Sequence, residues 1–215
     1  MYYFDFPFLS QPLHLIIASI IIGIQIYILF ELRHVKKMIK LVILDVDGVM
    51  TDGKKYYDRD GNVVMKNFCD KDWTAVKRFR AIGIPVVFLT GDPFNAKILS
   101  NRNLPYVVNR GEGFHRDKVN FLDEILLDYN CGAEDVVYLG DDLFDYGIME
   151  AVGHPYSMAD SPAMLQNISV PLACKGGENA IMYLYEDLEE LEIIPRIPYD
   201  VVMEKIYELD LKEKF

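Results

Sequence analysis

The feature that most limits the fold is a series of short apolar segments separated by segments of helical character. Four such segments occupy residues 41–44, 85–89, 106–108 and 136–139. Runs of this length suit strands that are buried on both faces. Strands that alternate with helices predict an α/β fold, in which helices cover both faces of a parallel sheet.

The intervening segments are expected to be helices, and a hairpin is expected before the first of them. The helices are predicted over residues 72–82, 94–101, 117–129 and 143–152. Asp72 is expected to cap the first helix and Gly83 to end it. Residues 54–57 and 62–68 flank Asp60-Gly61, a pair that suits a tight hairpin turn. After residue 179 we expect an acidic helix, a break at 194–198 and a last amphipathic helix.

The first 37 residues differ in character from the rest. Residues 6–30 contain no Asp, Glu, Lys or Arg. As a helix they would span about 37 Å, more than the roughly 30 Å hydrocarbon core of a bilayer. Basic residues from Arg33 to Lys40 then predict a membrane anchor with the following domain in the cytoplasm. Two alternatives stay open: an incorrectly assigned start upstream of Met38, or a buried or interfacial apolar arm.

Composition excludes several classes of protein. The net charge is −11, from 22 basic and 33 acidic residues, so no nucleic-acid partner is expected, because such binding relies on Lys and Arg. The three cysteines, Cys69, Cys131 and Cys174, are odd in number and lack metal-ligand spacing. A disulfide scaffold and a zinc ribbon are therefore excluded, and a reducing compartment is expected.

Acidic residues follow two of the predicted strands. Asp45 and Asp47 follow the first strand, and Asp141, Asp142 and Asp145 follow the last. Carboxylates this close need a cation or a shared proton, and Mg²⁺ suits oxygen ligands of this kind. One carboxylate of the first pair could act as a nucleophile and the other as an acid/base. Taken alone, the first pair also fits an ordinary Asp-rich strand end, and the last cluster a solvated acidic turn at the start of a helix.

Two further positions suit a phosphate group. Thr90-Gly91 follows the second strand, where a hydroxyl and the backbone N–H groups at a helix start can hold phosphate oxygens. Lys118 begins a predicted helix and could neutralise a phosphate. A single Thr-Gly pair is a weak signal, and a single lysine is more often a surface residue. His115, close to Lys118, could contact substrate, but the favoured interpretation is a surface loop.

The order of these pieces resembles the haloacid dehalogenase superfamily of phosphotransferases. The pieces are Asp45-Val46-Asp47-Gly48-Val49-Met50-Thr51, Thr90, Lys118, and Gly140-Asp141 through Asp145. Over residues 40–184 the chain is similar to phosphatases of 3-deoxy-D-manno-octulosonate 8-phosphate and of related nine-carbon sugar acids. This closer resemblance rests on residues 45–53, the hairpin at 57–61, Lys66 with Phe68, Gly140-Asp141-Asp142, and Gly176-Gly177 before Ala180.

The resemblance implies a Rossmann-like sheet without a cap domain. A β-hairpin at 54–68 would replace the lid, and neighbours in a homotetramer would close the site. The expected organisation is an apolar helix in residues 1–37, a phosphatase domain in 38–190 and an acidic helical tail in 191–215.

The resemblance also implies a mechanism and a set of site residues. Asp45 would form an aspartyl-phosphate, and Asp47 would act as acid and then base. Mg²⁺ would be bound by Asp45, Asp47 (through its carbonyl) and Asp141, supported by Asp142 and Asp145. The substrate would be a small phosphorylated sugar acid, bound by Asp47, Lys71, Lys77, Thr90, Gly91 and Lys118.

Three departures from the family pattern concern the substrate. Asp92 stands where the family usually has Arg, Asp72-Trp73 replaces an Asp-Gly pair, and Ser100 replaces a basic residue, although Arg102 is near. A carboxylate in place of a guanidinium turns an anion clamp into a repulsive group. The alternatives are therefore a phosphatase of another small sugar phosphate and a catalytically silent interaction module.

Overall fold

The computed structural model describes residues 17–25, 38–110 and 113–213. The chain forms two compact units, 1–37 and 38–215. In the first unit, residues 17–25 are helical. The rest of the predicted span, 6–16 and 26–30, lies outside the described residues. Within the part of the chain that the structure describes, no helix is both long and apolar enough to cross a membrane.

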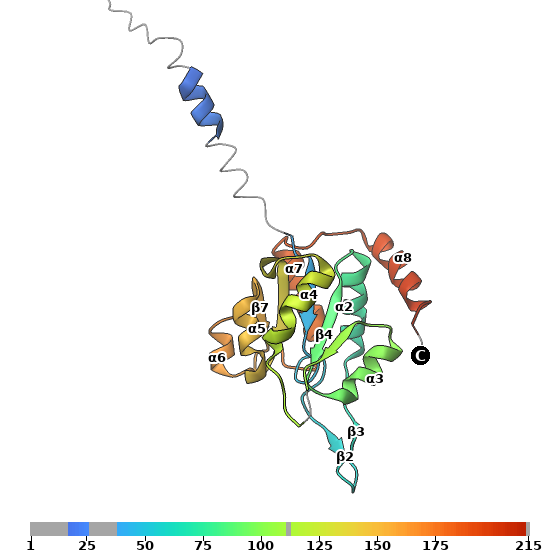
Figure 1. The fold of residues 1–215 in the computed structure, drawn as a ribbon. Helices are drawn as coiled ribbons and strands as arrows, with labels where there is room; N and C mark the ends of the chain where they lie inside the picture. The colour runs from blue at the N-terminus through green and yellow to red at the C-terminus, as the bar shows by residue number, and fades with distance from the viewer. Residues whose placement is uncertain (1–16, 26–37, 111–112, 214–215) are drawn as a thin grey trace, which may run out of the picture. The chain divides into compact units, whose positions relative to one another are not determined.

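The second unit is built on a six-stranded parallel sheet (Figure 1). The parallel arrangement and the first four strands in chain order were predicted, and the last two were not. The strand order is β5-β4-β1-β6-β7-β8. The strands are β1 (Leu41–Leu44), β4 (Val86–Thr90), β5 (Tyr106–Val108), β6 (Val136–Gly140), β7 (His154–Ser157) and β8 (Val170–Pro171). β1 lies between β4 and β6, so the carboxyl ends of these three strands meet at one edge of the sheet.

Helices cover both faces of the sheet. Successive side chains of β1 point to opposite faces, so each face has its own apolar cluster with the helices that cover it. Val42 and Leu44 pack in one apolar cluster, together with residues of α2, α3 and α7. Leu41 and Ile43 pack in the other, with residues of α4, α5 and α6. The helices are α2 (Asp70–Ala81), α3 (Pro93–Asn101), α4 (Leu122–Tyr129), α5 (Tyr146–Ala151), α6 (Ala163–Gln166), α7 (Ala180–Glu190) and α8 (Tyr199–Asp210).

A small hairpin stands between β1 and α2. Its strands, β2 (Tyr56–Tyr57) and β3 (Val63–Met65), are antiparallel and shorter than predicted. Gly61 in the connecting turn has a φ of +81°, which glycine adopts without strain. Figure 1 shows the hairpin projecting from the body of the unit. No larger domain is inserted at this point, where residues 46–69 are all described.

Several boundaries differ from the sequence prediction. The helix expected at 117–129 is a 3₁₀ turn, Lys118–Phe121, followed by α4, and the one at 143–152 is a 3₁₀ turn, Leu143–Asp145, followed by α5. Strand β7, which begins at His154, is not among the predicted strands. Proline argues against a strand in sequence, yet β7 contains Pro155 and pairs with a strand on each side.

The sequence predicted that Asp72 would cap its own helix, and this prediction is wrong. Cys69 is the N-cap residue of α2, and Asp72 lies one turn further, fully buried. Its Oδ1 accepts a hydrogen bond of 2.8 Å from the backbone N–H of Ile181, at the start of α7. Its Oδ2 has no hydrogen-bond partner among the described residues. Burial raises the pKa of Asp72 to about 6, against the lowering effect of the α7 backbone N–H groups.

Replacing Asp72 with asparagine is expected to stabilise the protein above pH 6. Because the folded pKa of about 6 exceeds the ordinary 3.8, the Asp72 contribution to stability is largest below pH 4 and falls as the pH rises to 6. The loss is about 3 kcal/mol at 1.36 kcal/mol per pKa unit. Asparagine can still accept a hydrogen bond from the backbone N–H of Ile181. Urea unfolding should therefore show that the free energy of unfolding of the variant rises relative to that of the parent chain between pH 4 and 6. A variant less stable than the parent at pH 7.5 would contradict this account.

Candidate active site

A cavity of about 280 Å³ opens at the carboxyl ends of β1, β4 and β6. Its walls come from the loops that follow these strands, from the base of the hairpin, and from the segment between β5 and α4. The lining residues are Asp45, Asp47, Gly48, Gly53, Lys55, Gly91, Asp92, Asn109, Arg110, His115, Lys118, Asp141, Asp142, Phe144 and Asp145. The acidic clusters found in sequence are thus brought together in one site.

Asp45 forms the floor of the cavity together with a buried lysine. Its Oδ2 lies 2.8 Å from Lys118 Nζ, and its Oδ1 accepts a hydrogen bond from the backbone N–H of Val46. Burial raises the pKa of Asp45 to about 7; the positive charge of Lys118 opposes this rise and the negative charge of Asp145 adds to it. Asp45 is therefore a desolvated carboxylate whose negative charge depends on a cation beside it.

Asp145 is held by four hydrogen-bond donors. Its Oδ1 accepts from Lys118 Nζ at 2.5 Å and from the Tyr138 hydroxyl at 2.6 Å. Its Oδ2 accepts from the backbone N–H groups of Asp141 and Asp142, at 2.8 and 3.1 Å. Both oxygens are thus engaged in fixing the loop after β6 and the position of Lys118.

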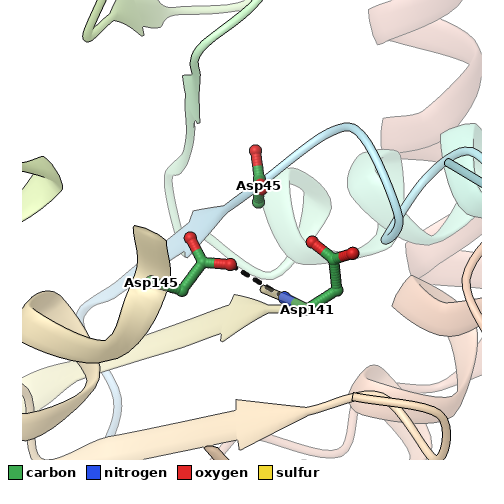
Figure 2. Close-up of side chains that lie close together, drawn as sticks. All are labelled: Asp45, Asp141 and Asp145. Atoms are coloured by element: carbon green, nitrogen blue, oxygen red, sulfur yellow. Dashed lines mark hydrogen bonds between the residues drawn. The ribbon is translucent and has the colours of Figure 1, made fainter. Parts of the chain in front are cut away.

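Among the described residues, no hydrogen-bond donor holds the Asp141 carboxylate in this way, and only the charge of Lys118 opposes the rise in its pKa. Burial raises its pKa to about 9, with further contributions from the negative charges of Asp45 and Asp145. Carboxylate oxygens of these three residues all lie within 4.8 Å of one another, and Figure 2 shows them grouped at the ends of β1 and β6. This donor set fits a hard divalent cation, which would relieve the repulsion. Because both oxygens of Asp145 already accept two hydrogen bonds each, Asp45 and Asp141 are the two carboxylates of this group that remain to bind a metal.

Gly48 allows Asp141 to approach the loop after β1. Its φ is +79°, and a Cβ added there would lie 1.8 Å from Asp141 Oδ2. Any side chain at this position would push the carboxylate away from Asp45.

Asp47 is tied to the hairpin by a buried lysine. The Lys66 side chain is fully buried, and its Nζ lies 2.7 and 2.9 Å from the two carboxylate oxygens of Asp47. The same Nζ donates to Asn95 Oδ1 and to Asp92 Oδ2, at 2.8 Å each. Asn95 Nδ2 donates in turn to Asp47 Oδ2 at 3.1 Å. Lys66 therefore joins the hairpin, the loop after β1 and the start of α3.

Asp92 is neutralised by two lysines, which the sequence argument for repulsion did not foresee. Its Oδ2 accepts from Lys55 at 2.7 Å as well as from Lys66, and its Oδ1 caps α3 by accepting from the backbone N–H of Phe94. Burial alone would raise the pKa of Asp92, but the hydrogen bonds from Lys55 and Lys66 hold it well below its usual range.

The chain shares 34% identity over 145 residues with the curated 3-deoxy-D-manno-octulosonate 8-phosphate phosphatase of Yersinia pestis, a match that covers 66% of this chain and 75% of that protein. The chain belongs to this phosphatase family. Like the family, it is a hydrolase of the haloacid dehalogenase superfamily. No protein-family model matches the chain.

Solved structures agree with this assignment. The cobalt-bound phosphatase of Haemophilus influenzae aligns with a TM-score of 0.64 and 27% identity, over 71% of this chain and 88% of that one. The Yersinia pestis enzyme aligns with a TM-score of 0.61 and 26% identity, over 80% and 84%.

Two of the residues expected to bind phosphate in this phosphatase line the cavity, and one does not. Lys118 and Gly91 are part of the wall. Thr90 is fully buried beneath it, and its hydroxyl accepts hydrogen bonds from Asn95 Nδ2 at 2.8 Å and from the Asp92 backbone N–H at 3.3 Å. In this structure Thr90 orients Asn95, and through it Asp47.

Two of the lysines expected to bind the substrate, Lys71 and Lys77, lie outside the cavity wall. Lys71 is exposed in the first turn of α2. Lys77, further along α2, forms ion pairs with Asp210 at the end of α8 and with Glu213 just beyond it. The tail therefore engages a cation that the family resemblance assigned to substrate.

Three cationic or titratable residues of the site were missed or assigned elsewhere from the sequence. Lys55, Arg110 and His115 all line the cavity, and for His115 the sequence favoured a surface loop over contact with substrate. Its ring packs edge-on against Phe144 at 5.0 Å between ring centres and close to Gly91, where an added Cβ would lie 3.0 Å from Cε1. Burial lowers the pKa of His115, and the positive charges of Arg110, Lys118 and Lys55 lower it further.

Proposed function

We propose that this phosphatase hydrolyses the phosphate monoester of a small keto-deoxy sugar acid, of which 3-deoxy-D-manno-octulosonate 8-phosphate is the first candidate. The observation that carries the proposal is the buried Asp45 carboxylate, paired with Lys118 and facing Asp141 in the cavity. The names of the relatives supply the substrate class. A phosphatase of another small sugar phosphate is the alternative, because Asp92 changes the chemistry of the cavity wall.

The chemistry has two steps. Asp47, paired with Lys66 in the free protein, takes up a proton from solvent when the ester binds. Asp45 then attacks phosphorus, the phosphorus–oxygen bond to the sugar breaks, and the leaving oxygen takes that proton from Asp47. Asp47 then accepts a proton from water, whose oxygen attacks the aspartyl-phosphate and releases phosphate while Asp45 is regenerated. Lys118, held by Asp145, balances the negative charge of the transferring group.

A divalent cation, Mg²⁺ by preference, would be held by Asp45 and Asp141 with the carbonyl of Asp47, and would shield the phosphoryl oxygens from the nucleophile's charge. Removing metal with a chelator is expected to lower turnover at least about a hundredfold, and added Mg²⁺ should restore it. Asp141→Asn should raise the Mg²⁺ concentration needed for half-maximal activity by more than about tenfold. Turnover that survives exhaustive chelation would contradict the metal assignment.

Phosphate release from a panel of esters tests the function itself. The panel contains 3-deoxy-D-manno-octulosonate 8-phosphate, nine-carbon analogues and simple sugar phosphates, each with Mg²⁺. We expect the eight- or nine-carbon acids to give the highest kcat/KM. A preference for a simple sugar phosphate would favour the alternative, and folded protein without turnover on any ester would favour a silent interaction module.

The assembly and the location of the protein stay predictions. Sedimentation would test the homotetramer that the family resemblance implies. Membrane fractionation of the full chain beside residues 38–215 would test the cytoplasmic placement and the expected anchor at residues 6–30.

A further inference from the structure

Four charged side chains form a continuous network on one side of the cavity. Lys66 bridges Asp47 and Asp92, and Lys55 pairs with the same oxygen of Asp92, Oδ2. The outer pair of this network, Lys55 and Asp92, carries no net charge. Its inner lysine, Lys66, is fully buried, whereas the Lys55 side chain is 30% exposed and lines the cavity together with Asp92.

The position of Lys55 follows from that of Asp47. Under the proposed function, on which this inference rests, Asp47 faces the leaving oxygen of the ester. Lys55 Nζ lies 3.9 Å from Asp47 Oδ2, so Lys55 and Asp92 face the alcohol part of the substrate. Lys118 contacts Asp45 and therefore faces the phosphoryl group.

A paired ammonium and carboxylate favour a neutral ligand over an anion. An anion would gain little here, because Asp92, 2.7 Å from Lys55, offsets its charge. A hydroxyl needs one acceptor and one donor, and the pair offers both: Asp92 accepts, and Lys55 has three N–H donors, of which one is directed at Asp92.

We propose that Lys55 and Asp92 form a specificity site that binds a hydroxyl on the carbon next to the ester carbon of the substrate. The 3.9 Å between Lys55 and Asp47 suits a group one carbon removed from the leaving oxygen. The substrate is accordingly a polyhydroxylated phosphate ester. Asp92 then serves to bind one of its hydroxyl groups, and its effect is not limited to the repulsion of anions.

A cycle of one substitution and one substrate change tests the proposal. Lys55→Met keeps the aliphatic stem but removes the donor. The neighbouring Lys54→Met is the matched control, because Lys54 is 75% exposed, pairs with Asp52 and does not line the cavity. Each variant is assayed with the best ester of the panel and with its analogue lacking the hydroxyl next to the ester carbon.

The hydroxylated ester should lose about ten- to a hundredfold in kcat/KM with Lys55→Met, the range for a hydrogen bond to a charged group. The deoxy analogue should react more slowly with the parent chain but lose less than about threefold further with Lys55→Met, since the two changes remove one interaction. Lys54→Met should match the parent on both.

Equal losses on the two esters would overturn the proposal, because Lys55 would then act on the phosphoryl group or on the fold. Unchanged kinetics of Lys55→Met would overturn it as well, with the proposed function still standing. Parent protein that hydrolyses no ester would overturn the proposed function and this inference with it.

Discussion

Replacing Asp45 with asparagine is expected to lower kcat by about 10⁴-fold or more, as removal of a covalent nucleophile does elsewhere. The amide has nearly the shape of the carboxylate but cannot form an acyl phosphate. The fold should survive, because Lys118 keeps its bond to Asp145. Burial already opposes the negative charge of Asp45, whose pKa is raised to about 7. A neutral amide at this position therefore removes the free-energy cost of burying that charge.

Turnover at saturating Mg²⁺ and urea unfolding at pH 8 measure the two effects separately. Asp142→Asn is the matched control: Asp142 also lines the cavity, but its Oδ1 accepts from the backbone N–H of Leu143, which an amide oxygen can do equally well. We expect it to lose less than about tenfold in kcat. If Asp45→Asn keeps a tenth of the activity, a different group attacks phosphorus.

The parts of the fold that the sequence predicts well are those where local pattern and burial agree. β1, β4 and β6 are uninterrupted apolar runs in the centre of the sheet, and each was placed within one residue. β7 was missed because His154 and Pro155 carry no strand signal, and it is a strand only through its pairing with β6 and β8.

In the site, too, some contacts follow from local sequence pattern and others depend on tertiary packing. Parallel strands deliver Asp45 and Asp141 to one edge of the sheet, so their proximity follows from the topology. The partners of Asp92 do not, because Lys55 and Lys66 reach it from a hairpin 26 to 37 residues away. That contact depends on how the hairpin docks against α3, which no local pattern encodes.

Asp145 and Asp141 follow one strand four residues apart, yet they are expected to respond to substitution in opposite directions. Asp145→Ala would leave the buried Tyr138 hydroxyl and two backbone N–H groups without their acceptor and take one carboxylate from Lys118. Breaking a buried ion pair of this kind costs about 3–5 kcal/mol. Asp141→Asn should instead stabilise metal-free protein at pH 8, since burial and two neighbouring carboxylates already oppose its charge.

Urea unfolding in the presence of a chelator separates the two roles. A large loss of stability for Asp145→Ala, with none for Asp141→Asn, identifies Asp145 as the residue that fixes Lys118 and the loop after β6, and leaves Asp141 as the metal ligand. If Asp145→Ala unfolds like the parent chain but no longer binds Mg²⁺, then Asp145 is itself a ligand. The hydrogen bonds seen at its two oxygens would then have to rearrange when the metal binds.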